Sequence, residues 1–130
     1  MKEYKVFIWI GVFMIFVVCG LVWLAGQNED VDMESTKKLN EEGITLFYGD
    51  GCPHCEDVER FNEENDIKNK VIFEELEVWK DKENAKLMND AAKICELNLE
   101  KIGVPFLFAD GKCYVGSPEV QNFFGEKARS

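Results

Sequence analysis

The chain has few basic residues. Its 130 residues include 15 Lys and Arg, 25 Asp and Glu, and one histidine. After Gly26 there are 13 Lys and Arg against 24 Asp and Glu, so the excess of negative charge lies in the C-terminal part. Nothing in such a domain offsets the repulsion of phosphate groups, which argues against nucleic-acid binding. The simplest role of this acidity is to keep the domain soluble.

Charged residues are absent from Val6 to Ala25. At about 1.5 Å per residue, a helix of this length spans roughly the 30 Å of bilayer hydrocarbon. A secretory signal peptide usually has a shorter apolar stretch and a small-x-small cleavage site, which Trp23 fits poorly. The valines before Cys19 are not the small residues of a lipoprotein signal. We therefore predict an uncleaved transmembrane signal anchor over residues 6–26.

The charges on either side of this anchor predict its orientation. Two lysines lie in residues 1–5, whereas acidic residues follow the anchor and no Lys or Arg occurs before Lys37. The positive-inside rule makes residues 1–5 a cytoplasmic stub and places the remainder outside the cell membrane. That side is oxidising, so cysteine pairs there can persist as disulfides. Residues 27–42 are polar and read as a linker, with one helical turn near 35–42.

The apolar pattern of residues 43–130 alternates between strands and helices. Four strands are expected, at 44–48, 71–79, 104–109 and 112–115, and three helices, at 53–64, 82–100 and 118–128. The first β-α-β unit should be a right-handed crossover with parallel strands, and Asp110-Gly111 predicts a tight hairpin turn. The order β-α-β-α-β-β-α predicts an α/β fold with a four-stranded mixed sheet flanked by helices.

Two cysteines lie just after the first predicted strand, in Cys52-Pro53-His54-Cys55. This spacing at a strand-to-helix junction is typical of a redox-active dithiol. Cys52 is expected to be the nucleophile, because the N–H groups and dipole at a helix start favour a thiolate. Cys55, one turn later and more buried, should resolve the mixed disulfide. Pro53 and His54, the two residues between the cysteines, are expected to tune how strongly the disulfide is held. Pro53 also suits the first helical turn, and the alternative for His54 is a solvated residue with no tuning role.

A second close pair of cysteines is missing. Structural zinc sites usually take four ligands from two such pairs, whereas Cys95 and Cys113 are single residues, so no metal is expected. If Cys52 pairs with Cys55 and Cys19 lies in the anchor, Cys95 and Cys113 are the two cysteines that remain outside the cell, an even number that allows a second pair. Three alternatives remain open for them: a second disulfide, free cysteines in the core, or a relay to the first pair.

The order of elements, together with the CPHC motif, resembles the thioredoxin superfamily in its minimal, glutaredoxin-like form. The motif itself resembles that of DsbA-type oxidases, and the resemblance covers roughly residues 43–127. Gly103-Val104-Pro105 resembles the cis-proline segment of the superfamily. The resemblance implies that Pro105 is cis and faces the dithiol, and that the backbone of Val104, beside Gly103, binds substrate as a short added strand. An ordinary trans proline at a strand start is the alternative.

One position departs from the superfamily pattern. Thioredoxin-like enzymes often bury a carboxylate six residues before the first cysteine, where this chain has Leu46. Glu74, Glu75 or Glu77 on the second predicted strand could substitute, or they could form a solvated strand face. The route of the Cys55 proton is therefore left open.

The predicted function is that of a membrane-tethered oxidoreductase that donates disulfides to exported proteins with free thiols, and no cofactor is expected. The resemblance implies re-oxidation by a quinone-linked membrane protein of the DsbB or vitamin K epoxide reductase type. The tether would raise the local concentration near that partner. Two alternatives remain: a disulfide reductase or isomerase of the same fold, and a non-catalytic, metallochaperone-like binding module.

Overall fold

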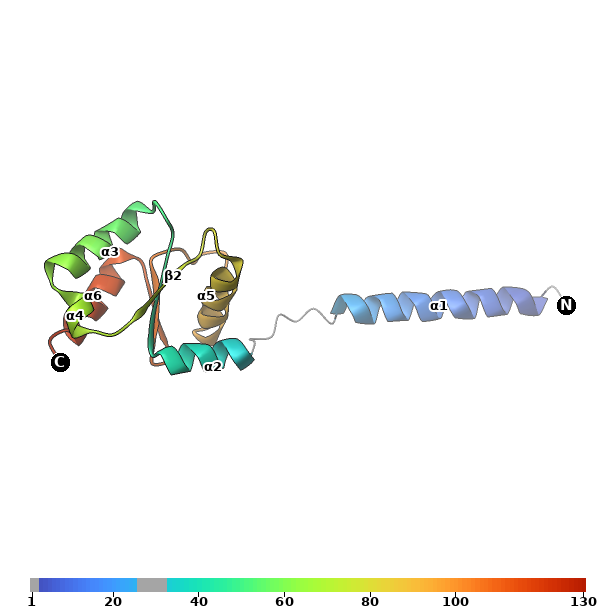
Figure 1. Cartoon of the computed structure of the whole chain (residues 1–130). Coiled ribbons are helices and arrows are strands. Elements are labelled where there is room, and N and C mark those ends of the chain that lie inside the picture. The colour runs from blue at the N-terminus through green and yellow to red at the C-terminus, as the bar shows by residue number, and fades with distance from the viewer. Residues whose placement is uncertain (1–2, 26–32) are drawn as a thin grey trace. The chain divides into compact units, whose positions relative to one another are not determined.

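A computed structural model of the chain describes residues 3–25 and 33–130, which fall into two compact units. The first unit contains helix α1 (Glu3–Ala25), drawn in blue in Figure 1. Its segment Glu3–Trp23 is long and apolar enough to cross a membrane, and the side chains described there are exposed. The predicted end of the anchor at residue 26 and the first part of the linker lie outside the described residues.

A four-stranded mixed sheet forms the centre of the second unit, with the strand order β2-β1-β3-β4. The strands are β1 (Ile44–Tyr48), β2 (Glu74–Glu77), β3 (Phe106–Ala109) and β4 (Lys112–Val115). β2 runs parallel to β1, and the two later pairs are antiparallel. Asp110 and Gly111, with φ of 51° and 74°, join β3 to β4, as a tight hairpin turn requires. The predicted fold class is confirmed.

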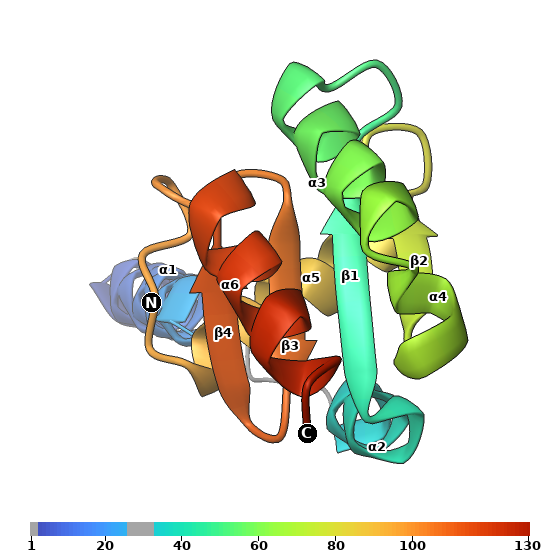
Figure 2. The same cartoon turned by 90° about the vertical axis from the view of Figure 1, so that its left-hand side faces the viewer.

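Helices cover both faces of this sheet, as Figures 1 and 2 show. On one face lie α3 (Pro53–Glu64), α4 (Ile67–Lys70) and α6 (Ser117–Lys127), and on the other lie α2 (Met33–Glu42) and α5 (Lys82–Ile94). Side chains alternate along β1, so Leu46 enters the first core and Phe47 the second. The side chains at the end of β1 therefore point to known faces of the sheet, and the candidate site begins at this end of the strand.

The folded unit begins earlier than Gly43, where the sequence pattern placed its start. α2 spans Met33–Glu42, and Leu39 is fully buried in the core that α5 covers. Burial of one leucine contributes about 1.5–3 kcal/mol, enough to hold a short polar helix against the domain. A single apolar residue gives no periodicity, so the predicted linker from residue 27 to 42 was too long.

Other element boundaries also differ from the prediction. The expected strand 71–79 is reduced to β2, and the chain before it forms the short helix α4. The expected helix 82–100 ends at Ile94, because Glu96 adopts the left-handed region with φ of 56°. The remaining differences are one or two residues at the start of β3 and at both ends of α6.

Candidate functional site

Cys52 and Cys55 lie at the junction of β1 and α3. Cys52 is the N-cap residue of α3 with an extended backbone, and Pro53 occupies the first helical turn. The carbonyl of Cys52 accepts hydrogen bonds from the N–H groups of Cys55 and Glu56, both at 3.0 Å. Both thiols are free. Cys55 is 9% exposed and Cys52 is 5% exposed, so Cys55 is not the more buried of the two, contrary to the expectation.

The segment before β3 faces this dithiol. The Val104–Pro105 peptide bond is cis, and Pro105 lines the same cavity as both cysteines. The Cys52 thiol donates to the carbonyl oxygen of Val104 at 3.8 Å. Gly103 is exposed and Val104 half-buried. Backbone groups of an accessible segment therefore lie beside the sulfur that was predicted to be the nucleophile.

A cavity of about 230 Å³ opens beside the two thiols. Its walls come from the end of β1, the loop after it, α3, α4, β2 and Pro105. Burial, followed by the hydrogen bond with Cys52, raises the pKa of the Cys55 thiol to about 12. Cys55 is therefore protonated at neutral pH and must lose its proton before it can act as a nucleophile.

The carboxylate of Glu77 organises the loop that leads to Cys52. It accepts hydrogen bonds from the backbone N–H groups of Asp50, Trp79, Lys80 and Asp81, at 2.8–3.3 Å. Burial alone would raise the pKa of Glu77, but these four bonds together hold it below its usual value. Glu77 is thus a structural carboxylate rather than a substitute for the one missing at Leu46.

The same loop is held from outside by Trp79 and Lys80. A Cβ atom at Gly49 would lie 2.3 Å from the Trp79 ring, so only glycine allows this close approach. Lys80 forms an ion pair with Asp50, and this hydrogen bond and charge hold the pKa of Asp50 below its usual value. The turn between β2 and α5 therefore fixes the position of the loop before Cys52.

His54 lies on the outer surface of α3. Its side chain is 77% exposed, and its Nδ1 atom is 3.9 Å from a carboxylate oxygen of Asp57. Among the described residues, its ring makes no hydrogen bond to Cys52 or Cys55. A tuning role for His54 therefore stays a prediction that depends on proximity within the motif.

Of the three glutamates considered as substitutes for the missing carboxylate, Glu75 is the one that lines the cavity. It pairs in register with Leu46, which is buried on the same face of the sheet. Glu74 pairs with Thr45 and belongs to the opposite face. The ammonium group of Lys68 donates to Glu75 at 2.8 Å.

Sequence reasoning missed three other ionisable residues of this cavity, Glu56, Glu59 and Lys68. Glu59 could have been found, because residues four apart on a helix share a face and Glu59 follows Cys55 by four. Lys68 could not, because α4 was not predicted and nothing local relates it to the strand that follows.

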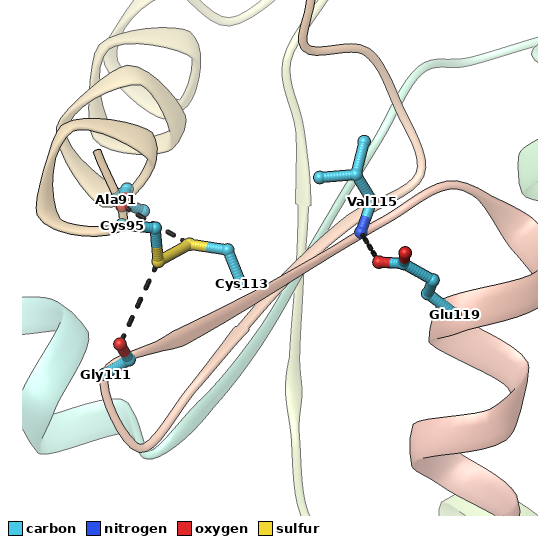
Figure 3. The surroundings of a disulfide bond; sticks show 6 residues. All are labelled: Ala91, Cys95, Gly111, Cys113, Val115 and Glu119. Atoms are coloured by element: carbon cyan, nitrogen blue, oxygen red, sulfur yellow. Dashed lines mark hydrogen bonds between the residues drawn. A yellow bond between two sulfur atoms is a disulfide. The ribbon is translucent and has the colours of Figure 1, made fainter. Parts of the chain in front are cut away.

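The two remaining domain cysteines form a disulfide between Cys95, at the end of α5, and Cys113 on β4 (Figure 3). Of the three alternatives left open by the sequence, the structure has the bond. Both cysteines pack against the core that α5 covers, whereas Leu46 and Val58, which line the cavity, belong to the other core. The bond and the dithiol thus lie on different faces of the sheet, which argues against a relay.

No metal centre is apparent in the part of the chain that the structure describes. Across residues 3–25 and 33–130, no three His, Cys, Asp or Glu side chains are grouped so that they could hold an ion.

Comparison with known proteins gives a match in structure and none in sequence. No protein-family model matches the chain, and no curated protein sequence matches it. The structure is similar to a buckwheat glutaredoxin in complex with glutathione, with a TM-score of 0.53 and 15% identity over 78% of this chain and 88% of that one. Oxidised glutaredoxin 2 from Chlamydomonas reinhardtii gives 0.51 and 16% over 73% and 82%. The chain has a glutaredoxin-like fold.

This agrees with the fold that the order of elements in the sequence predicted. At this level of identity the glutaredoxin-like fold says nothing by itself about substrate or direction, since one fold supports many functions. Those must be argued from the site.

Proposed function

We propose that the protein is a thiol:disulfide oxidoreductase that acts through Cys52 and Cys55. The observation that carries this proposal is the position of two free thiols at the start of α3, with the Cys52 sulfur 3.8 Å from the carbonyl beside Pro105. A helix N-terminus favours a thiolate, and the accessible backbone at Gly103 and Val104 can pair with an extended substrate. The glutaredoxin-like fold supports the same chemistry.

In the oxidising direction, a substrate thiolate attacks Cys52 in the Cys52–Cys55 disulfide. A bond forms between the substrate sulfur and Cys52, and Cys55 leaves with the electron pair and takes up a proton. A second substrate thiolate then attacks the first substrate sulfur, which releases Cys52 as a thiolate. The substrate loses two electrons, and the dithiol gains them.

We also propose that α1 anchors the domain on the outer side of the cell membrane. The length and apolar character of α1 support a membrane span, and Lys2 and Lys5 at its N-terminal end support this orientation. The bond between Cys95 and Cys113 supports it too, because structural disulfides persist in oxidising compartments. Exported proteins with free thiols would then be the substrates.

The proposed direction is donation of the disulfide, with re-oxidation by a quinone-linked membrane protein of the DsbB or vitamin K epoxide reductase type. His54 and the helix start both favour the reduced, thiolate form, which makes the disulfide a stronger oxidant. The anchor would keep the domain near a membrane partner and raise its effective concentration there.

The reduction potential of the Cys52–Cys55 pair tests the direction. For the full chain in detergent, we expect a value less negative than about −180 mV, toward the DsbA figure of about −120 mV. The variant His54→Ala should lower the potential by about 30 mV, which equals about 1.4 kcal/mol of lost stabilisation of the reduced form. Equilibration in glutathione buffers, followed by alkylation and mass analysis, measures both values.

Arg60→Ala is the matched control, because Arg60 is also an exposed residue of α3 and also pairs with Asp57. It should leave the potential unchanged. A wild-type value near the thioredoxin figure of about −270 mV would contradict the oxidase direction and favour a reductase. A pair that does not exchange with dithiothreitol at all would instead favour a non-catalytic binding module.

A further inference from the structure

We propose that Glu75, held in place by Lys68, removes and returns the proton of Cys55 through water in the cavity beside the dithiol. This inference rests on the proposed exchange chemistry of Cys52 and Cys55. It names the proton-transfer group for that chemistry, in either direction of electron flow.

The exchange needs such a group at one defined step. When Cys52 is joined to a substrate sulfur, Cys55 attacks Cys52, a bond forms between their sulfurs, and the bond from Cys52 to the substrate breaks. The substrate sulfur leaves with the electron pair, and the proton of Cys55 passes to the base. Burial is the largest cause of the raised pKa of Cys55, and it persists in the mixed disulfide, so very little Cys55 is a thiolate at pH 7 and the unassisted step is slow. The reverse step returns the same proton to Cys55.

The cavity provides a route for this proton. Its volume of about 230 Å³ holds several water molecules, since each occupies about 30 Å³ in the liquid. Besides the two thiols, several ionisable side chains line it. They are Tyr48 at the end of β1, Asp50 in the loop after it, Glu56 and Glu59 on α3, Lys68 on α4, and Glu75 on β2.

Among these carboxylates, Glu75 is the best placed to accept the proton. All four carboxylates are exposed, and both Asp50 and Glu75 form ion pairs, so neither property separates them. What distinguishes Glu75 is its backbone: Asp50 lies in the loop before Cys52, and Glu56 and Glu59 lie on α3. Glu75 stands on β2 beside the buried Leu46, where the strand fixes its position.

Lys68 orients the Glu75 carboxylate. Its ammonium group lies 2.8 Å from one carboxylate oxygen, which leaves the other oxygen available to water. The hydrogen bond to Glu75 raises the pKa of Lys68, so Lys68 stays charged throughout the working range. Lys68 is thus a positioning residue, and Glu75 is the group that exchanges the proton.

A two-step release of thionitrobenzoate tests the proposal on the full chain in detergent. A Cys19→Ala background removes the exposed thiol of α1, and mild reduction opens only the Cys52–Cys55 pair. With 5,5′-dithiobis(2-nitrobenzoate), the first thionitrobenzoate leaves when Cys52 attacks the reagent. The second leaves when Cys55 attacks the resulting mixed disulfide. The first release therefore reports the proposed function, and the second reports the loss of the Cys55 proton.

We expect Glu75→Gln to slow the second release at pH 7 by about tenfold or more and to leave the first unchanged. The sign is informative, because removal of a negative charge near a thiol lowers the thiol pKa and would by itself speed the second release. Glu59→Gln is the matched control, since it removes the same charge from the same cavity. It should leave the second release as fast as in the parent or slightly faster.

An unchanged or faster second release in Glu75→Gln would overturn the proposal, and so would equal slowing in Glu59→Gln. The parent protein gives an independent check if the variant does not fold. A built-in base makes the second release nearly independent of pH over roughly pH 6 to 9, whereas direct loss of the proton to solvent makes it rise about tenfold per pH unit. The absence of the first release would count against the proposed function instead.

Discussion

Replacement of Cys52 by serine should abolish disulfide exchange, whereas replacement of Cys55 should stop the reaction halfway. A serine hydroxyl at position 52 is not ionised at neutral pH and forms no disulfide, so we expect turnover to fall by at least about a thousandfold. In Cys55→Ser, the Cys52 sulfur can still attack a substrate disulfide, but nothing resolves the product. A covalent complex with the substrate should then accumulate and be visible on a non-reducing gel.

The asymmetry between the two variants follows from the geometry of the site. Cys52 is the N-cap of α3 and lies beside the Val104 carbonyl, where a substrate backbone can approach. Cys55 is a turn further along and holds its proton to a pKa of about 12. Cys19→Ala is the matched control, because it removes the thiol of α1 and leaves the sequence of the domain unchanged. Accumulation of the complex in Cys52→Ser rather than in Cys55→Ser would show that Cys55 is the nucleophile and would contradict the assignment of Cys52.

Removal of the disulfide should cost stability without changing the exchange reaction. The bond closes a loop of 18 residues between the end of α5 and β4. In the chain-entropy model, a loop of about this size contributes about 3 kcal/mol by restricting the unfolded chain. The double variant Cys95→Ala, Cys113→Ala should therefore unfold at a temperature lower by roughly 10 °C or more. Thermal unfolding of the full chain, followed by circular dichroism, measures the shift.

The prediction that exchange is unchanged distinguishes a structural disulfide from a redox relay. The bond packs against the core under α5, and the dithiol cavity lies on the face covered by α3. The exchange rate and potential of Cys52 and Cys55 should therefore match the wild type below the unfolding transition. Loss of exchange in a double variant that is still folded would show that Cys95 and Cys113 take part in the reaction. An unchanged unfolding temperature would contradict the stabilising role.

The sequence predicted the sheet and the dithiol well because both depend on local signals. β1 is a largely apolar run, the CPHC motif follows it after the short loop Gly49-Asp50-Gly51, and Asp110-Gly111 forms the turn that its residues favour. One helical turn was expected near residues 35–42, but the packing of α2 against the domain was not, because it depends on Leu39, whose burial is decided by contact with α5. α4 was missed for a related reason, since four residues carry no helical period.

The surroundings of the dithiol were harder to predict than the dithiol itself. Glu77 was considered as a substitute carboxylate, but its role is set by four N–H groups that meet only when two loops fold together. The pairing of Lys68 with Glu75 depends on a turn whose geometry the sequence does not show. The bond between Cys95 and Cys113 stayed one of three alternatives because it depends on where α5 ends.

Stoichiometric disulfide transfer is the most direct test of the proposed chemistry. Oxidised full-length protein in detergent is mixed with a reduced, unfolded peptide that carries two cysteines, and the products are trapped with acid and mapped by mass spectrometry. We predict that each molecule transfers one disulfide to the peptide, that Cys52 and Cys55 become reduced, and that Cys95 and Cys113 stay bonded. A peptide that remains reduced while the Cys52–Cys55 disulfide stays intact would contradict the proposed function.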